Sequence, residues 1–266
     1  LKIIIVCEPP LMSDVFFDKF IAMLNSTKIY GIRSIIEAIK SNESIDKIFL
    51  QKGLKGPLFS ELEQLCRKER LNVSYVPIEK LNRLTKENHQ GAVAQIAPIN
   101  FWDIEELVEN ILSKNKAPLF LILDQLSDVR NFGAIVRTAE CTGVDGIIIQ
   151  KKGGAPVNAD AIKTSAGAMF KIPICKVDHI KDAVYHLQAS EINVLAATEK
   201  TDKVIYDMNL NQPLAIIMGS EGKGINPSVV KICDGSLKLP ILGDIDSLNV
   251  SVACGAILYE VVRQRS

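Results

Sequence analysis

The chain has 266 residues, enough for one large domain or two of medium size. Apolar residues make up 47% of the chain and charged residues 23%, which is typical of a globular protein with a substantial core, and no apolar run reaches the length of a membrane span. The 31 basic and 31 acidic residues cancel, so a nucleic-acid-binding surface would have to be a local patch.

The N-terminal segment, residues 1–27, matches no pattern that we can assign. Its apolar run after Lys2 is short and ends at Pro9 and Pro10, and no small-residue cleavage site follows, so we do not interpret it as a signal peptide. We treat residues 1–27 as an N-terminal appendage without an assigned role.

The cysteines and histidines form no ligand pattern. No two cysteines have C-x-x-C spacing, and several lie within apolar runs, which favours reduced, structural thiols over a disulfide framework. We therefore expect a cytoplasmic protein without a metal site. The residues concerned are Cys7, Cys66, Cys141, Cys175, Cys233, Cys254, His89, His179 and His186.

Residues 28–98 alternate between short strands and helices, which predicts a small α/β domain. A helix with Ile32, Ile35 and Ile39 on one face follows Tyr30, and His89-Gln90-Gly91 is interpreted as a turn before the last strand. Strands are expected at 47–50, 73–76 and 91–96, and further helices at 58–70 and 78–84. Residues 99–118, with an acidic helix at 103–112 closed by Pro118, are interpreted as a linker.

Residues 119–266 alternate strictly between apolar strands and helices. Continuous apolar strands of this kind predict a parallel sheet covered on both faces, with ligands bound beyond the carboxyl ends of the strands. Strands are expected at 119–123, 146–149, 172–175, 194–197, 214–218 and 237–239, and helices at 133–141, 159–166, 181–189 and 227–232, with a last helix to the C-terminus.

Two strand ends carry unusual residues. Asn131 fits an N-cap, and Arg137 follows among apolar neighbours, where an arginine could grip phosphate or simply be solvated. The turn after 214–218 has three glycines around Glu221, which allow close approach to a ligand. It is not a phosphate-binding loop of the Walker type, because Gly224 follows Lys223 where a serine or threonine is required.

The third strand end leads into the last helix. Ser247 stands where an N-cap is expected, and Asn249 adds a polar group that is unfavourable inside a helix. Apolar residues then recur at helical spacing, which places them on one face of the predicted helix: Leu248, Val252, Ala256, Tyr259 and Val262. Taken alone, this segment is typical of a well-capped core helix.

Together the three strand ends are far more specific. N-x-G-x-x-x-R from Asn131, G-x-E-x-x-G from Gly219 and P-x-x-x-x-x-x-S-L-N-V-S from Pro240 resemble the three motifs of the SpoU/TrmH family of RNA ribose 2′-O-methyltransferases, in the SPOUT superfamily. The resemblance covers 119–266. Residues 28–98 resemble the N-terminal RNA-binding domain of the RlmB-like branch, whose substrate is a guanosine of 23S ribosomal RNA.

The resemblance implies a fold, a cofactor and a partner. The C-terminal domain is expected to be a parallel-sheet SPOUT domain with a deep trefoil knot, preceded by the small α/β RNA-binding domain. The knot is expected to bind S-adenosylmethionine, and the family is dimeric. The residues implied near the cofactor are Gly219, Leu239 and Leu248, with Thr198 as a further neighbour.

The resemblance also implies site residues for methyl transfer to a ribose 2′-hydroxyl. Because a guanidinium stays protonated, we expect Arg137 to hold a phosphate and stabilise the developing alkoxide rather than act as a base. Asn131 and Asn249 are expected to position the ribose or Arg137, Ser247 to bond near phosphate or cofactor, and Glu221 to orient Arg137 or anchor the turn. The structural alternatives are a cap for Ser247 and for Asn131, a turn residue for Glu221 and a bond that stabilises the knot for Asn249. The general base stays open.

Three alternatives remain. A transfer-RNA 2′-O-methyltransferase would share the motifs, although simple members lack the N-terminal domain. A non-catalytic RNA-binding or ribosome-assembly protein could keep the fold, but the complete set of motif residues argues against it. A nucleotide-binding enzyme is disfavoured by the missing phosphate-loop patterns.

Overall fold

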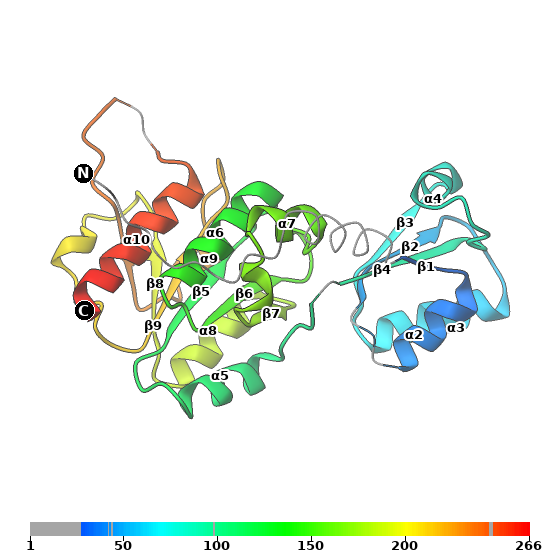
Figure 1. Cartoon of the computed structure of the whole chain (residues 1–266), viewed down its shortest axis with the longest axis horizontal. Coiled ribbons are helices and arrows are strands. Elements are labelled where there is room, and N and C mark those ends of the chain that lie inside the picture. The colour runs from blue at the N-terminus through cyan, green and yellow to red at the C-terminus, as the bar shows by residue number, and fades with distance from the viewer. Residues whose placement is uncertain (1–27, 42, 44, 98, 245–246) are drawn as a thin grey trace.

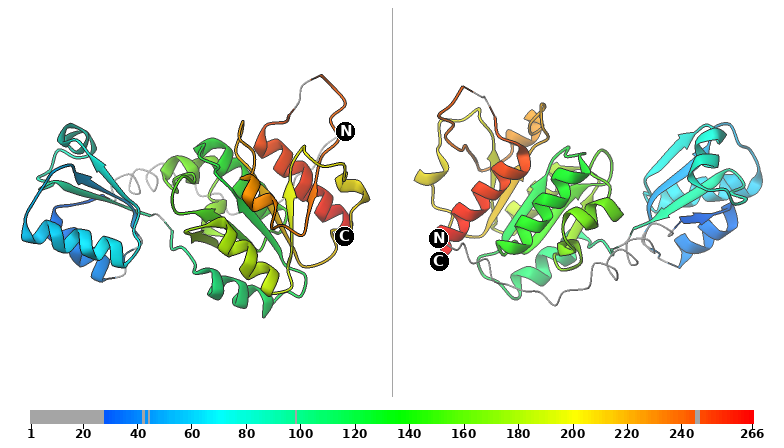
Figure 2. Two further views of the ribbon diagram at one scale, coloured as in Figure 1. Left: turned by 180° about the vertical axis from the view of Figure 1, so that it is seen from behind. Right: turned by 45° about the horizontal axis from the view of Figure 1, so that its top comes forward.

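The computed structural model describes residues 28–41, 43, 45–97, 99–244 and 247–266, and the N-terminal appendage 1–27 lies outside this range. Within the described residues the chain forms a four-stranded and a six-stranded sheet. The two sheets lie in separate lobes of the molecule (Figure 1), which the view from behind also shows (Figure 2).

The smaller sheet has the order β1-β4-β2-β3. Only β2 and β3 pair in parallel, and the other pairs are antiparallel. Helices α2 and α3 pack on one face, while α4 covers Phe49, Val76 and Val93 on the other through Leu81. The predicted elements are confirmed, and the short strand β1 was not predicted. The bounds are β1 Lys28–Tyr30, α2 Ile32–Lys40, β2 Ile45–Gln51, α3 Pro57–Lys68, β3 Val73–Val76, α4 Ile78–Leu84 and β4 Ala92–Ile96.

The larger sheet has the order β10-β8-β9-β5-β6-β7, and every pair of neighbouring strands is parallel. The central strands are buried along their whole length, as their unbroken apolar sequences predict. The small domain followed by a parallel α/β sheet is therefore confirmed. The bounds are β5 Leu119–Leu123, β6 Gly146–Gln150, β7 Ile174–Val177, β8 Asn193–Ala197, β9 Leu214–Met218 and β10 Gly235–Leu237.

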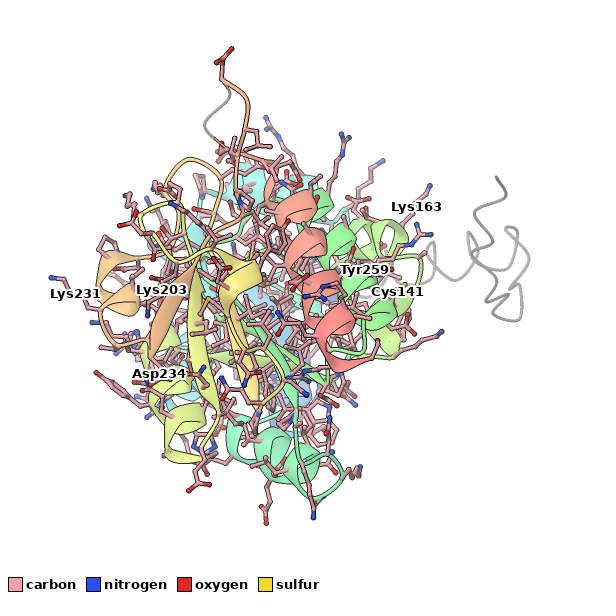
Figure 3. The ribbon with its side chains drawn as sticks, turned by 90° about the vertical axis from the view of Figure 1, so that its left-hand side faces the viewer. Cys141, Lys163, Lys203, Lys231, Asp234 and Tyr259 are labelled. Carbon is pink, nitrogen blue, oxygen red and sulfur yellow. The ribbon has the colours of Figure 1, made fainter. Side chains whose placement is uncertain are left out.

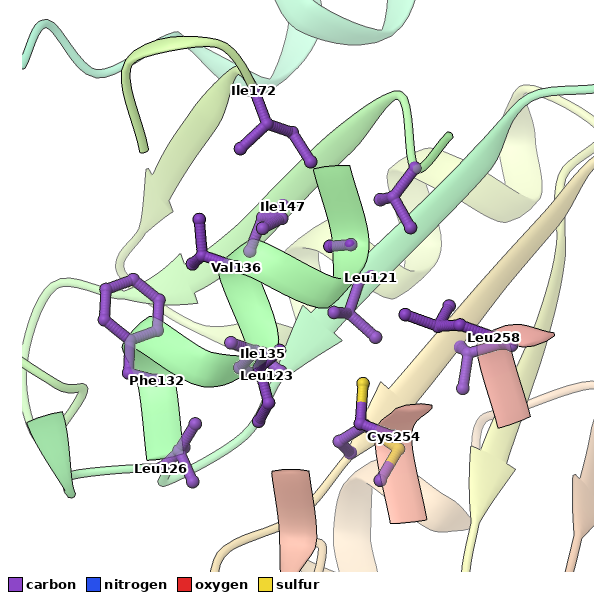
Figure 4. Close-up of a cluster of buried hydrophobic side chains, with 14 of the residues drawn as sticks. Leu121, Leu123, Leu126, Phe132, Ile135, Val136, Ile147, Ile172, Cys254 and Leu258 are labelled. Carbon is purple, nitrogen blue, oxygen red and sulfur yellow. The ribbon is translucent and has the colours of Figure 1, made fainter. Parts of the chain in front are cut away.

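Helices cover both faces of the larger sheet. On one face α6, α7 and α10 form an apolar core in which Leu121, Phe132 and Leu258 are fully buried (Figure 4). On the other face α5, α8 and α9 form a second core. The bounds are α5 Ile104–Leu112, α6 Val129–Cys141, α7 Ala159–Thr164, α8 Ile180–Ala189, α9 Pro227–Val230 and α10 Val250–Arg265.

The interpretation of residues 99–118 as a linker is wrong for its helix. Leu107, Val108 and Ile111 of α5 are buried in the second core of the larger sheet. These three residues share one face of the helix at i, i+1 and i+4 spacing, and the acidic residues point away from it. The acidic composition hid this apolar face, so α5 is part of the larger domain.

The strand order predicts where the larger sheet can bind a ligand. From β5 the chain runs outward through β6 and β7, and it then crosses to the other side to form β8 and β10, with β9 beside β5. Such a reversal leaves an opening at the carboxyl ends of the two central strands. These strands are β5, which ends at Leu123, and β9, which ends at Met218.

Candidate active site

Asp124 ties the two central strand ends together. Its carboxylate is buried and accepts the backbone N–H of Asn226 at 2.7 Å, and its own N–H donates to the carbonyl of Met218 at 2.9 Å. A buried carboxylate is stable only with such partners. The sequence carries a usable signal for this residue, because an aspartate directly follows a wholly apolar strand.

Asn131 projects from the first turn of α6 rather than capping it. The cap is Asp128, whose carboxylate accepts the N–H of Asn131 at 2.7 Å. The helix therefore begins at Val129, four residues earlier than predicted, and the predicted N-cap role of Asn131 is wrong. Its side-chain amide is consequently available for contacts beyond its own helix.

The glycine turn after β9 is closed on itself. Ser220 and Gly224 exchange two backbone hydrogen bonds of 3.2 and 2.9 Å, and Gly222 and Gly224 have positive φ angles of 83° and 67°. A Cβ atom on Gly219 would overlap the backbone of Gly224 and Ile225. The turn thus requires glycine at position 219, because the backbone there lies directly against that of Gly224 and Ile225. Glu221 lies at the exposed tip of the turn.

Asn249 is the N-cap of α10. Its Oδ1 accepts the N–H groups of Ser251 at 2.9 Å and Val252 at 3.4 Å. The prediction that Ser247 is the cap is wrong, because the helix begins at Val250 and Ser247 lies exposed before it. Capping uses only the oxygen of the Asn249 amide, so the nitrogen is free to donate elsewhere.

Asn131, Glu221 and Asn249 meet in one hydrogen-bonded cluster, which we call the Asn–Glu–Asn cluster. The Nδ2 of Asn249 donates to Glu221 Oε1 at 2.7 Å and to Asn131 Oδ1 at 3.1 Å. The Nδ2 of Asn131 donates to the same Glu221 oxygen at 3.0 Å. One carboxylate thus fixes both amides, and three segments far apart in sequence are joined at the carboxyl edge of the sheet.

Arg137 does not join the Asn–Glu–Asn cluster. It lies six residues after Asn131 on α6, a rise of about 9 Å along the axis and a rotation onto another face. It is exposed and forms no hydrogen bond or ion pair with the described part of the chain. Its guanidinium is therefore available to a ligand from outside the chain.

The residues implied near the cofactor follow neighbouring strands. Gly219 comes directly after β9 and Thr198 directly after β8, and Leu239 lies two residues after β10. Because β10, β8 and β9 are adjacent and parallel, their carboxyl ends lie about 5 Å apart along one edge. The N–H of Thr198 donates to the Leu237 carbonyl at 2.9 Å, which fixes this edge. Leu239 is half-buried and Leu248 is 47% exposed.

Two further findings concern the ranges that the structure describes. They contain no group of histidine, cysteine, aspartate and glutamate side chains arranged to hold a metal ion. No helix within these ranges has the length and apolar character needed to cross a bilayer. The thiols of Cys175 and Cys254 are buried in the two cores, and desolvation raises the pKa of each to about 12, so these cysteines contribute packing.

The fold is a parallel α/β sheet joined to a small α/β domain, and the Asn–Glu–Asn cluster lies at the carboxyl ends of the sheet's central strands. The chain belongs to the SpoU/TrmH family of RNA methyltransferases. The sequence model of the SpoU rRNA Methylase family matches residues 118–259, and that described as RNA 2′-O ribose methyltransferase substrate binding matches residues 28–102.

Individual relatives agree with this assignment. YacO of Bacillus subtilis (strain 168), named for the TrmH family of tRNA/rRNA methyltransferases, is 34% identical over 90% of this chain and 96% of its own. The SpoU methyltransferase AviRb of Streptomyces viridochromogenes, solved in complex with AdoMet, has a TM-score of 0.59 at 22% identity, over 94% of this chain and 98% of AviRb. The A. aeolicus TrmH/SpoU tRNA modifying enzyme has a TM-score of 0.52 at 28% identity, over 61% of this chain and 84% of that one.

Proposed function

We propose that this protein transfers a methyl group from S-adenosylmethionine to the 2′-hydroxyl of a guanosine ribose in 23S ribosomal RNA, in the cytoplasm. The observation that carries the proposal is the Asn–Glu–Asn cluster, since it brings one residue from each of the three family motifs into direct hydrogen bonding. Capping of α10 accounts for the oxygen of Asn249 but not for the two bonds that its nitrogen donates to Glu221 and Asn131. We assign methyl transfer to residues 119–266 and RNA binding to residues 28–98.

The strand ends beside the cluster fit S-adenosylmethionine, the ligand named for AviRb. Gly219 packs directly against the backbone of Gly224 and Ile225, which keeps the turn at this strand end compact, and the backbone at Thr198 and Leu239 extends the same edge. Leu248 offers an exposed apolar surface beside this edge. The cofactor supplies an activated methyl group, and the protein supplies orientation.

The chain's residues act by positioning and by electrostatics. Holding the hydroxyl and the methyl donor in line is worth about 7–11 kcal/mol, and assisted proton loss contributes about 10²–10⁴-fold in rate. The cluster fixes the loops on which both partners rest. Arg137, free and cationic, is proposed to hold the phosphate beside the target ribose and stabilise the developing alkoxide, with Ser247 bonding to the same phosphate or to the cofactor.

Arg137→Lys is expected to keep methyl transfer within about tenfold of wild type, because a point charge suffices for positioning, whereas Arg137→Ala should lose about a hundredfold or more. Single-turnover methylation of the RNA measures both. Arg130→Ala is the matched control, an exposed arginine on the same helix, and should change the rate little. A loss in Arg137→Lys as large as that in Arg137→Ala would instead indicate a role that only a guanidinium fulfils.

The small domain offers a basic edge for RNA. The loops after β1, β2 and β3 meet the turn before β4, joined by bonds such as that from Gln51 N–H to the Gly91 carbonyl at 2.8 Å. We call this end the distal edge of the small domain. Its cations are exposed and form no ion pair with the residues that the structure describes, so they are available to phosphates. They are Arg33, Lys52, Lys55 and Lys86.

We also propose a homodimer through α10. Of the apolar residues predicted to share one face of this helix, Leu248 lies before its start. The others follow helical spacing, but their face is largely exposed, with Val252 at 56% and Tyr259 at 57%. The core side is formed by Cys254, Ile257 and Leu258 instead. Figure 3 shows α10 beside α6, with Tyr259 and Cys141 labelled on them. An exposed apolar stripe next to a ligand edge is typical of a subunit interface.

Sedimentation is expected to give twice the 29.2 kDa chain mass, and Tyr259→Asp should give the single chain mass, because a carboxylate cannot be buried unpaired at an apolar contact. The matched control is Tyr185→Asp on α8, where a tyrosine is 54% exposed on the opposite face of the sheet. Monomeric wild-type protein at micromolar concentration would contradict the dimer.

Methyl transfer from labelled S-adenosylmethionine to unmodified 23S ribosomal RNA and to bulk transfer RNA, assayed side by side, tests the proposed function. Label on a guanosine ribose of the 23S RNA alone is the expected result. Label on transfer RNA would instead favour a transfer-RNA 2′-O-methyltransferase. The A. aeolicus TrmH/SpoU tRNA modifying enzyme, which is similar to this chain over 61% of this chain's length, modifies RNA of that kind. No label on either RNA, with cofactor still bound, would favour a non-catalytic RNA-binding or assembly protein.

A further inference from the structure

We propose that a set of polar contacts fixes the small domain against the larger one, so that the two RNA-contacting surfaces act as one rigid site; the role in RNA positioning rests on the proposed function. We call this set the interdomain latch. The residues on the two sides are Asp46, Arg70 and Asn72 of the small domain, and Lys151, Lys176 and Asp178 of the larger domain.

The centre of the latch is an ion pair that is almost buried. Lys176 of β7 donates to the carboxylate of Asp46 in β2, and the two side chains are only 12% and 8% exposed. The Nζ of Lys176 also lies 3.9 Å from the centre of the Phe101 ring, a cation–π contact. A charge buried in this way is stable only with its partner, so this geometry requires both domains in place.

The backbone around Asp46 aims its side chain at the larger domain. The pairing of β2 with β4 shifts register between Ile45 and Lys47, which marks a β-bulge at Asp46. Bulges re-aim a side chain and are typical of functional positions. Burial lowers the pKa of the Lys176 ammonium group, and the charge of Asp46 opposes that shift, as expected for a cation kept charged by one specific partner.

A second group of contacts lies beside the ion pair. Arg70 approaches the Asp178 carboxylate at 3.6 Å, and Lys151 approaches the same oxygen at 3.4 Å. The Nδ2 of Asn72 donates to the backbone carbonyl of Lys151 at 3.3 Å. Only the Arg70–Asp178 and Asn72–Lys151 contacts cross between the domains, since Lys151–Asp178 lies within the larger one. Each is weak because it is partly solvated, so these contacts supplement the buried central pair.

The connection between the domains is short and is itself attached. Trp102 pairs with Cys175 as an added bridge at the edge of β7, and its N–H donates to the Ile174 carbonyl at 2.9 Å. Only residues 97–100 therefore separate the end of β4 from the attached Phe101 and Trp102. A tether of this length permits little independent movement once the latch is closed.

The latch has a geometric consequence for the substrate. It contacts the end of the small domain where β2 and β3 begin, whereas the distal edge lies where these strands end. The seven residues of β2 span about 20 Å between the two ends. The basic distal edge is thus held well away from the Asn–Glu–Asn cluster, so the RNA must present a second element at a fixed distance from the methylated ribose.

Small-angle X-ray scattering of the whole protein tests the latch without reference to activity. Asp46→Lys and Lys176→Asp should each enlarge the radius of gyration, and the combined exchange should restore it. Glu61→Lys is the matched control, since it removes an ion pair to Lys40 at 3.4 Å within the small domain, and should leave the scattering unchanged. Asp46→Asn replaces Asp46→Lys if circular dichroism shows that the reversed charge prevents folding.

Methylation kinetics supply a second readout. The single variants are expected to raise KM for 23S RNA about tenfold with kcat nearly unchanged, since the chemistry is intact and only preorganisation is lost. Unchanged scattering in Asp46→Lys or Asp46→Asn would overturn the latch, whatever the activity. If the wild type methylates no RNA but the single variants still expand, the latch stands as an interdomain contact and the proposed function fails.

Discussion

Asn249→Ser is expected to lower methyl transfer about a hundredfold while leaving the protein close to wild-type stability. Serine is as good an N-cap as asparagine, so α10 should keep its start, but serine cannot donate to both Glu221 and Asn131 as the Nδ2 of Asn249 does. The three loops of the Asn–Glu–Asn cluster would then lose their common partner. Single-turnover methylation and thermal unfolding measure the two effects separately.

Two further variants complete this test. Asn249→Ala removes the cap as well and should cost a further ~1 kcal/mol of stability. Asn226→Ser is the matched control, because Asn226 caps α9 through its side-chain oxygen and takes no part in the Asn–Glu–Asn cluster. Full activity in Asn249→Ser would mean that the cluster is only a structural feature of the fold.

Gly219→Ala is expected to weaken binding of S-adenosylmethionine by more than about tenfold and to destabilise the protein by about 1–3 kcal/mol. The new methyl group would overlap the backbone of Gly224 and Ile225, so the turn would have to open. Calorimetric titration with the cofactor and thermal unfolding measure both effects.

The control for this variant is Gly255→Ala in the middle of α10. Its added Cβ would meet only Thr138 at an ordinary 3.7 Å, and alanine is the better helix residue by about 1 kcal/mol, so this variant should be as stable as wild type or more so. If Gly219→Ala bound the cofactor as tightly as wild type does, cofactor binding would not depend on the compact backbone of this turn.

Local sequence pattern was sufficient for most of the architecture. Continuous apolar runs such as 119–123 and 214–218 predicted parallel, fully buried strands, because only a sheet covered on both faces buries every side chain of a strand. The meeting of Asn131, Glu221 and Asn249 could be expected only from the resemblance to a family, since no local signal spans the intervening residues.

Other features could not be predicted, for identifiable reasons. The last helix is apolar on both sides, so spacing alone did not reveal that Val252 and Tyr259 face outward. The starts of two helices were misplaced because each is preceded by more than one residue that can act as an N-cap. Asp128 caps α6 instead of Asn131, and Asn249 caps α10 instead of Ser247. The Asp46–Lys176 pair joins residues 130 positions apart in two domains, and such a contact leaves no periodicity in the sequence.

The Asn–Glu–Asn cluster also has a consequence for synthesis. Its hydrogen bonds join residues 90, 28 and 118 positions apart, so the site has almost no local contacts. Contacts of high sequence separation form late, because the chain between them must first be ordered. On the ribosome Asn131 emerges first, then Glu221, and Asn249 is the last of the three. A nascent chain can therefore complete the small domain and most of the larger sheet while it still has no assembled site. Methyl transfer can begin only after the segment that carries Asn249 has docked against Asn131 and Glu221.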